Sequence, residues 1–251
     1  MPVMPGAEPF SSDAGPVGVL LCHGFTGCPQ SLRPWAEHLA AAGMTVRLPR
    51  LPGHGTTWRE LDMTRWQDWY AELDRTLTEL HARCAEVFVM GLSMGATLAL
   101  RLAEERGDDV SGLVLVNPSL LTKRPERHVA PVLQYVIRSL PAIASDIKKP
   151  GVTELAYDRV PSKAAYSLTK LWAATRGDLG KVTQPVLVFR SRTDHVVEPD
   201  SCAMLHEKVR STDIHEVVLE DSYHVATLDN DAQTIFDGSL EFVRRLARTK
   251  T

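Results

Sequence analysis

The sequence predicts an α/β fold in which a mostly parallel central sheet is flanked by helices. Short runs of aliphatic and β-branched residues alternate with longer amphipathic stretches along the chain, an order typical of parallel strands joined by crossover helices. The short runs are apolar throughout, as expected for strands that are buried on both faces. Most of them end in Gly, Pro, Asn or Asp, residues that favour turns.

Six runs are expected to form the strands of this sheet, at residues 17–22, 44–48, 87–90, 113–116, 186–189 and 217–219. The amphipathic stretches predict helices at residues 31–42, 64–83, 96–105, 201–209 and 232–247. In the third helix, the small side chains of Ala96, Ala99 and Ala103 beside Leu98 and Leu102 favour close packing on the sheet.

One connection is too long for a simple crossover. Residues 119–183 separate two consecutive strands, whereas a crossover needs only a helix and two short loops. Prolines interrupt this stretch between helical pieces, such as residues 132–140 and 164–174. We therefore expect an α/β core made of residues 1–118 and 184–251, with residues 119–183 inserted as a small cap over one end of the sheet.

Composition excludes several classes of function. The 251 residues are 44% hydrophobic and 24% charged, and 28 basic residues nearly balance 31 acidic ones. A net charge of −3 gives no field to attract nucleic acid or an anionic membrane. No apolar run is long enough to span a bilayer, and residues 1–10 lack the features of a signal peptide. We expect a cytoplasmic protein with no stable membrane anchor.

The four cysteines, at positions 22, 28, 84 and 202, form no CxxC pair. Their spacing fits neither a disulfide framework nor a thiolate metal site. They are expected to be free thiols, buried or incidental.

The motif Gly91-Leu92-Ser93-Met94-Gly95 lies between a predicted strand and a predicted helix. This is the strand, GxSxG, helix context of a nucleophile elbow. The glycines permit a sharp turn, which places the central serine in a strained conformation at a helix N-terminus, where developing negative charge is favoured. Ser93 is therefore the candidate nucleophile.

A serine hydroxyl needs a base to take its proton and an acid to orient that base. Asp194 follows the strand-like run at 185–190, and His224 follows the run at 214–219. The resulting order Ser93, Asp194, His224 is the order of α/β-hydrolases and not that of chymotrypsin or subtilisin. His195 is the rival base, and Asp221 and Glu198 are lesser candidates for the acid.

The tetrahedral intermediate needs two backbone donors. One is expected to be the amide of Met94, directly after the nucleophile, and the other the amide of Phe25 in the loop His23-Gly24-Phe25-Thr26-Gly27. The Phe25 ring either lines the acyl pocket or packs in the core, and the sequence does not separate these roles.

Several segments together resemble the bacterial monoacylglycerol lipase and carboxylesterase branch of the α/β-hydrolase superfamily. They are LLCHGFTGCPQSLRPWAEHLAAAGMTV, LPRLPGHGT, VFVMGLSMGATLAL, TDHVV and SYHVATLD. The likeness runs from about Gly6 to the last helix, and it includes cap residues 145–148 and 154–157. It implies a serine ester hydrolase acting on acylglycerols or simple carboxylic esters without metal or organic cofactor. The resemblance assigns the same five site residues as the motifs: Ser93, Asp194, His224, Phe25 and Met94. The sequence departs from the family pattern at Ala96, where glycine is expected, but alanine is small enough to keep the turn. It also departs at residues 123–139 of the cap, and this departure leaves the acyl-chain preference open.

The expected partner is a small ester, and the chain is expected to be a monomer or a homodimer. Apolar residues of the cap either form an acyl tunnel or pack on the sheet; they are Val132, Val136, Ile137, Leu140, Ile143, Leu168 and Leu171. Trp58, Trp66 and Trp69 are expected to be core residues, with an exposed patch as the alternative. The alternative functions are another acyl hydrolase on the same scaffold (a thioesterase, perhydrolase, C–C bond hydrolase or peptidase) and a non-catalytic ligand receptor.

Overall fold

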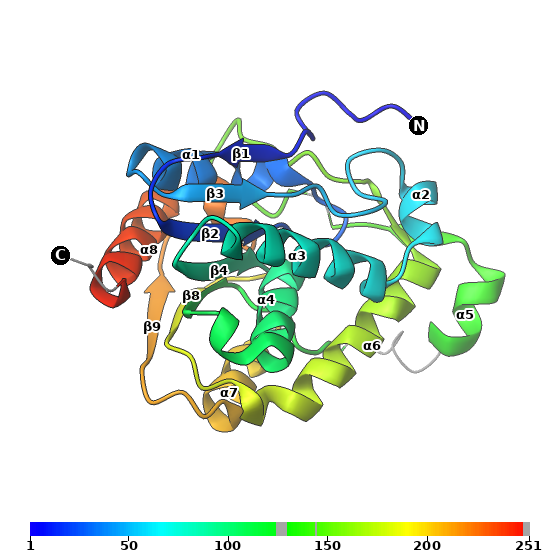
Figure 1. The fold of residues 1–251 in the computed structure, drawn as a ribbon. Coiled ribbons are helices and arrows are strands. Elements are labelled where there is room, and N and C mark those ends of the chain that lie inside the picture. Colours follow the sequence, from blue (N-terminus) through cyan, green and yellow to red (C-terminus); the bar gives the residue numbers. More distant parts are fainter. Residues whose placement is uncertain (124–129, 144, 248–251) are drawn as a thin grey trace.

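A seven-stranded sheet forms the centre of the computed structural model, which describes residues 1–123, 130–143 and 145–247 (Figure 1). Its strands are β1 (Phe10–Ser12), β2 (Val17–Cys22), β3 (Thr45–Leu48), β4 (Glu86–Leu92), β5 (Gly112–Val116), β8 (Val186–Ser191) and β9 (Ile214–Leu219). They are arranged in the order β1-β3-β2-β4-β5-β8-β9. Only the edge pair β1 and β3 is antiparallel, and the other neighbours run parallel. The predicted α/β-hydrolase architecture is confirmed.

Helices cover both faces of the sheet. On one face lie α1 (Arg33–Ala41) and α8 (Ala232–Leu246), and on the other lie α3 (Trp66–His81), α4 (Met94–Arg106) and α7 (Asp200–Lys208). Alternate residues of β4 point into the two cores, so that Val87 and Val89 pack with α3 and α4, whereas Phe88 and Met90 pack with α1 and α8. Burial on both faces explains why the strand sequences are continuously apolar.

The predicted strands and core helices are all present, with shifted ends. The helix expected at 31–42 begins as a 3₁₀ turn, Pro29–Leu32, and α1 starts afterwards with a proline in its first turn, a position that proline favours. Among the elements that were not predicted are β1 and α2 (Trp58–Met63). Strand β1 has three residues, two of them serines, and α2 is a short helix whose N-terminus is capped by the Thr57 side chain. Both are too short to show a periodic pattern.

The segment between β5 and β8 contains α5 (Ala130–Val136), β6 (Ser139–Pro141), β7 (Arg159–Pro161) and α6 (Ser162–Asp178). Figure 1 shows α5 and one end of α6 beyond the end of the sheet towards which β3 points. The helix predicted at 132–140 is wrong in its second half, because Ser139 pairs with Pro161 in a small antiparallel sheet. Residues 124–129 and 144 of the predicted cap lie outside the described residues. Treating 119–183 as one cap therefore stays our proposal.

The tryptophans belong to the core, as predicted. Trp69 is fully buried, and Trp58 and Trp66 pack against the same cluster while partly exposed. Each of the four cysteines is a buried free thiol. Within the described ranges, no helix combines the length and the apolar character needed to cross a bilayer.

Candidate active site

The turn that presents Ser93 depends on its two glycines. Ser93 joins β4 to α4 with φ 56° and ψ −116°, a conformation that L-residues rarely adopt. A Cβ atom on Gly91 would lie 2.3 Å from the carbonyl carbon of Gly95, and one on Gly95 would lie 1.9 Å from the carbonyl oxygen of Cys22. The Ser93 amide donates to the Val116 carbonyl at 2.9 Å, which anchors the turn to β5. The strained serine is thus held by close backbone packing.

The predicted acid and base meet at the carboxyl ends of β8 and β9. Nδ1 of His224 lies 2.8 Å from Oδ2 of Asp194, and each side chain is only 9% exposed. The other carboxylate oxygen, Oδ1, accepts the amides of Val196 and Val197, both at 2.8 Å. These two amides fix the carboxylate, which in turn orients the imidazole.

The three rival residues are engaged elsewhere. The His195 ring, whose side chain is 51% exposed, contacts the Asp146 carboxylate at 2.7 Å. Asp221 forms an exposed ion pair with Lys148. Glu198 accepts the Lys123 amide at 2.8 Å. Asp194 and His224 therefore form the pair best placed to assist Ser93.

The environment favours ionised Asp194 beside a readily protonated His224. Burial lowers the pKa of His224, but the charge of Asp194 and its hydrogen bond outweigh burial, so that the pKa lies above the ordinary imidazole value. Burial raises the pKa of Asp194, but the His224 charge and hydrogen bond and the two valine amides outweigh this, and the net shift is downward. Asp194 can therefore stabilise the imidazolium that forms when His224 takes a proton.

These shifts predict the pH dependence of hydrolysis. The predicted base, His224, must be neutral to take a proton, so kcat/KM is expected to rise with pH through an apparent pKa above the ordinary imidazole value of about 6.5. Glu154 lines the same cavity with a pKa of about 7, and Glu154→Gln serves as the control. The fall of kcat/KM at low pH, which is the acid limb of the pH profile, should persist in Glu154→Gln when a simple ester is the substrate. A limb that disappears with Glu154, or that lies well below pH 6.5, would contradict the assignment of His224 as base.

The predicted oxyanion donors lie next to Ser93. A Cβ atom on Gly24 would be 3.7 Å from that of Ser93, and Met94 is the first residue of α4. Among the described residues, neither the Phe25 amide nor the Met94 amide donates a hydrogen bond. The Phe25 ring both lines the cavity and packs against Trp69, with 5.7 Å between ring centroids. The two roles left open by the sequence are thus combined.

His23 supports this loop, a role that its sequence position did not reveal. It is fully buried, its Nδ1 donates to the Gly24 carbonyl at 3.0 Å, and its Nε2 accepts the Leu51 amide at 3.2 Å. In a planar trans peptide the carbonyl and the following N–H point in opposite directions. By fixing the Gly24 carbonyl, His23 also fixes the direction of the Phe25 N–H.

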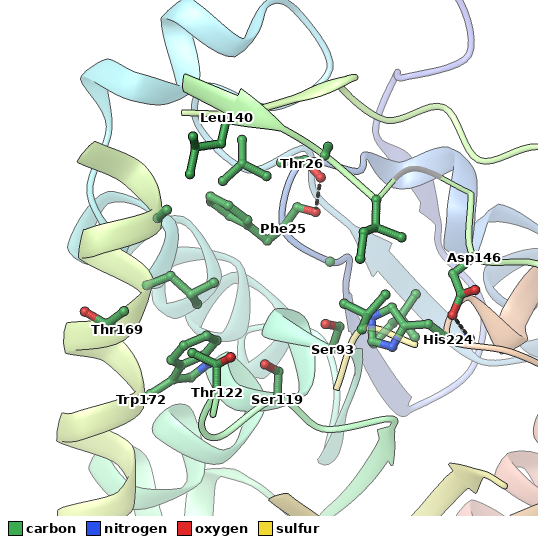
Figure 2. A pocket seen from close by; sticks show the side chains of 18 of the residues that line it. Phe25, Thr26, Ser93, Ser119, Thr122, Leu140, Asp146, Thr169, Trp172 and His224 are labelled. Atoms are coloured by element: carbon green, nitrogen blue, oxygen red, sulfur yellow. Dashed lines mark hydrogen bonds between the residues drawn. The ribbon is translucent and has the colours of Figure 1, made fainter. Parts of the chain in front are cut away.

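Ser93 and His224 line one cavity of about 510 Å³ (Figure 2). Its wall includes the apolar side chains Leu140, Ile143, Val160, Leu168 and Trp172, together with polar Thr26, Asp146 and Glu154. Of the apolar cap residues named from the sequence, Leu140, Ile143 and Leu168 line the cavity. Leu171 is buried, Ile137 is not part of the wall, and Val132 and Val136 are 70% and 76% exposed. An acyl tunnel that includes these last four residues is therefore wrong.

Besides Asp146, the cavity wall contains a second carboxyl group, that of Glu154, and no catalytic motif pointed to either of them. Glu154 follows β6 in the chain, and its Oε1 would be 2.6 Å from a Cβ atom on Gly27. Burial raises its pKa to about 7, and the charge of His224 opposes this rise. Among the described residues, no group donates a hydrogen bond to this carboxyl. A substrate hydroxyl would find an available partner there.

The candidate nucleophile, Ser93, and the candidate base, His224, line the same cavity but are not hydrogen-bonded to each other. Among the described residues, no hydrogen bond joins Ser93 Oγ to His224. Contacts of this kind are often long in unliganded enzymes and tighten when substrate binds. We therefore expect the Ser93–His224 hydrogen bond to form in the substrate complex.

Known proteins are similar to this chain in sequence and in fold. A family model described as serine aminopeptidase, S33 (Hydrolase_4) matches residues 17–231. The thermostable monoacylglycerol lipase of Bacillus sp. (strain H-257) is 44% identical over 251 residues, which cover 98% of both chains. A carboxylesterase of Bacillus subtilis (strain 168) is 26% identical, over 95% of this chain and 97% of its own. A solved structure described with LipS and LipT, two metagenome-derived lipolytic enzymes, superposes with a TM-score of 0.95 at 41% identity, covering 97% of this chain and 100% of its own.

Proposed function

This chain belongs to the family described as serine aminopeptidase, S33 (Hydrolase_4), and we propose that it hydrolyses monoacylglycerols and other carboxylic esters through an acyl-enzyme on Ser93. It is a serine hydrolase of the carboxylesterase and lipase class. The observation that carries the proposal is the Asp194–His224 pair, which lies at the cavity that also contains Ser93.

In the proposed reaction, Ser93 Oγ attacks the ester carbonyl carbon while His224 takes the hydroxyl proton. The amides of Phe25 and Met94 stabilise the oxyanion. The intermediate collapses when the ester C–O bond breaks, and His224 gives its proton to the departing alcohol. Water then attacks the acyl-enzyme, His224 takes a proton from that water, and the acid leaves as the proton returns to Ser93 Oγ.

The cavity is suited to an ester with a polar alcohol and an apolar acyl chain. Glu154 contributes a hydrogen-bond acceptor to the wall, and Leu140, Leu168 and Trp172 contribute apolar surface. A monoacylglycerol has both chemical parts, because two hydroxyls remain on its glycerol and one acyl chain extends from it. This match supports monoacylglycerols above simple esters as the preferred substrate.

A panel of matched substrates tests the proposed function. We expect hydrolysis of monoacylglycerols and of short-to-medium-chain esters. Fatty-acid release from a triacylglycerol should be much slower, because the volume of its three acyl chains exceeds that of a cavity of about 510 Å³. The panel includes an acyl thioester of the same chain length and an amino-acid anilide, because the family description names peptidases. Faster turnover of the thioester or the anilide than of the matched ester would contradict an ester hydrolase.

Glu154→Leu is expected to raise KM for a monoacylglycerol about tenfold, since a hydrogen bond to a charged group contributes about 1.5 kcal/mol or more. The ethyl ester of the same fatty acid lacks the glycerol hydroxyls, and its KM should change by less than about twofold. Steady-state kinetics on both esters check the difference. Equal changes for the two substrates would mean that Glu154 shapes the cavity without recognising the alcohol.

A further inference from the structure

The cap contributes a residue that touches the loop of the proposed base. The backbone carbonyl of Asp146 accepts the Val225 amide at 3.0 Å, and its carboxylate oxygen Oδ2 accepts the His224 amide at 3.1 Å. Figure 2 shows this second contact as the dashed line from Asp146 towards His224. Asp146 therefore holds the main chain at the base itself, from a segment outside the catalytic core.

The same carboxylate also holds the loop of the proposed acid. Oδ2 accepts the amide of His195, the residue directly after Asp194, at 3.2 Å. Oδ1 lies 2.7 Å from Nδ1 of the His195 ring. The Asp146 side chain is only 9% exposed, whereas the His195 ring that it contacts is 51% exposed. One carboxylate thus bridges the two loops that carry the acid and the base.

We propose that Asp146 is a positioning residue, whose carboxylate clamps the Asp194 and His224 loops together and so couples the placement of the cap to the alignment of the base. The proposal rests on the proposed function, since it concerns the same Ser93, Asp194 and His224. Asp146 acts through the main chain of these loops and need not touch the reacting ester.

The opposite side of His224 is held by the core. Asn117, directly after β5, donates from its side-chain nitrogen to the His224 carbonyl at 2.8 Å, and its side-chain oxygen accepts the Ser191 amide at 2.8 Å. The His224 amide is bound by the cap and its carbonyl by the core. Loss of the Asp146 side chain would remove the hydrogen bond to the His224 amide. Asn117 would still bind the His224 carbonyl and keep the His224 loop folded.

Asp146 also acts on His224 through its charge. The groups facing His224 are the carboxyls of Asp194, Glu154 and Asp146, all of which favour the protonated imidazole. Asp146 itself faces His195, and the His195 ring packs edge-on against Tyr223, with 4.7 Å between centroids. Removing the Asp146 charge should therefore move the acid limb of kcat/KM to lower pH, because a more weakly stabilised imidazolium loses its proton earlier.

Two substitutions separate geometry from charge. In Asp146→Asn the amide oxygen can still accept the two backbone amides, while the NH₂ group faces His195 Nδ1. This variant should keep kcat within about threefold and shift the acid limb to lower pH. Asp146→Ala removes acceptors and charge together, so kcat should fall about 10- to 100-fold, as for a displaced catalytic group, with little change in KM.

Asp221→Asn is the matched control. Asp221 lies three residues before His224 and pairs with Lys148 of the same cap segment, but it is exposed and does not contact the loop of Asp194. The control should keep the wild-type kcat and pH profile. Thermal unfolding of all three variants verifies that each is folded at the assay temperature.

The proposal is overturned if folded Asp146→Ala keeps the wild-type kcat, or if Asp146→Asn leaves the acid limb unmoved. Equal losses in Asp146→Ala and Asp221→Asn would likewise overturn it, because they would indicate general loosening of the cap. Ser93→Ala, measured in the same assay, keeps the two hypotheses apart. Its activity tests the proposed function, whereas the Asp146 variants test only the clamp.

Discussion

Replacing Ser93 with alanine is expected to lower kcat for ester hydrolysis about 10⁶-fold, leaving only the contributions of binding and of the oxyanion donors. Stability should change little. Alanine keeps the Cβ atom in the strained turn at φ 56°, and among the described residues the Ser93 hydroxyl makes no hydrogen bond that would be lost. Single-turnover and steady-state rates, with thermal unfolding in parallel, measure both effects.

Ser239→Ala provides the matched control for this substitution. Ser239 is fully buried in α8 and its hydroxyl donates to the Ile235 carbonyl, on the face of the sheet opposite α4. Loss of the Ser239 hydroxyl should lower the free energy of unfolding and leave kcat unchanged. If Ser93→Ala retained more than about a tenth of wild-type activity, the nucleophile would have to be another residue.

Asp194→Asn is expected to lower kcat about 10⁴-fold. Oδ1 of Asp194 accepts two backbone amides, so an asparagine should place its oxygen there and turn its NH₂ group towards His224 Nδ1. Nδ1 would then accept a hydrogen bond, and the proton of the neutral ring would move to Nε2. His224 could no longer take the Ser93 proton, although the geometry of the site would be preserved.

Glu198→Gln tests whether this loss is specific to Asp194. Glu198 lies on the same loop but accepts hydrogen bonds from Thr122 and Lys123 and does not contact His224. The Glu198→Gln variant should keep the wild-type kcat on a simple ester. A loss of less than about tenfold in Asp194→Asn would show that another group orients the imidazole.

Much of this fold could be predicted because its signals are local. Buried strands such as β4 are apolar on both faces, and the elbow requires glycine at positions 91 and 95, where a Cβ atom would strike the backbone. The departure at Ala96 is accommodated, since its small side chain is buried in the core between α4 and the sheet. The order of Ser93, Asp194 and His224 follows from the order of the strands that carry them.

The remaining features depend on contacts between distant segments. Ser139 leaves the predicted helix because it pairs with Pro161, and no local pattern marks this pairing. Asp146 and Glu154 reach the site only because the segment between β5 and β8 folds back over it. Their sequence neighbourhoods resembled the family, but nothing in the spacing of these residues indicated which atoms they would meet.

Covalent labelling with a fluorophosphonate, mapped by peptide mass, tests most directly whether an activated Ser93 hydroxyl is the centre of this site. The account predicts one adduct, on the peptide that contains Ser93, formed at a rate that falls with the same acid limb as ester hydrolysis. An adduct on a different residue, or no adduct on a preparation that hydrolyses esters, would contradict it.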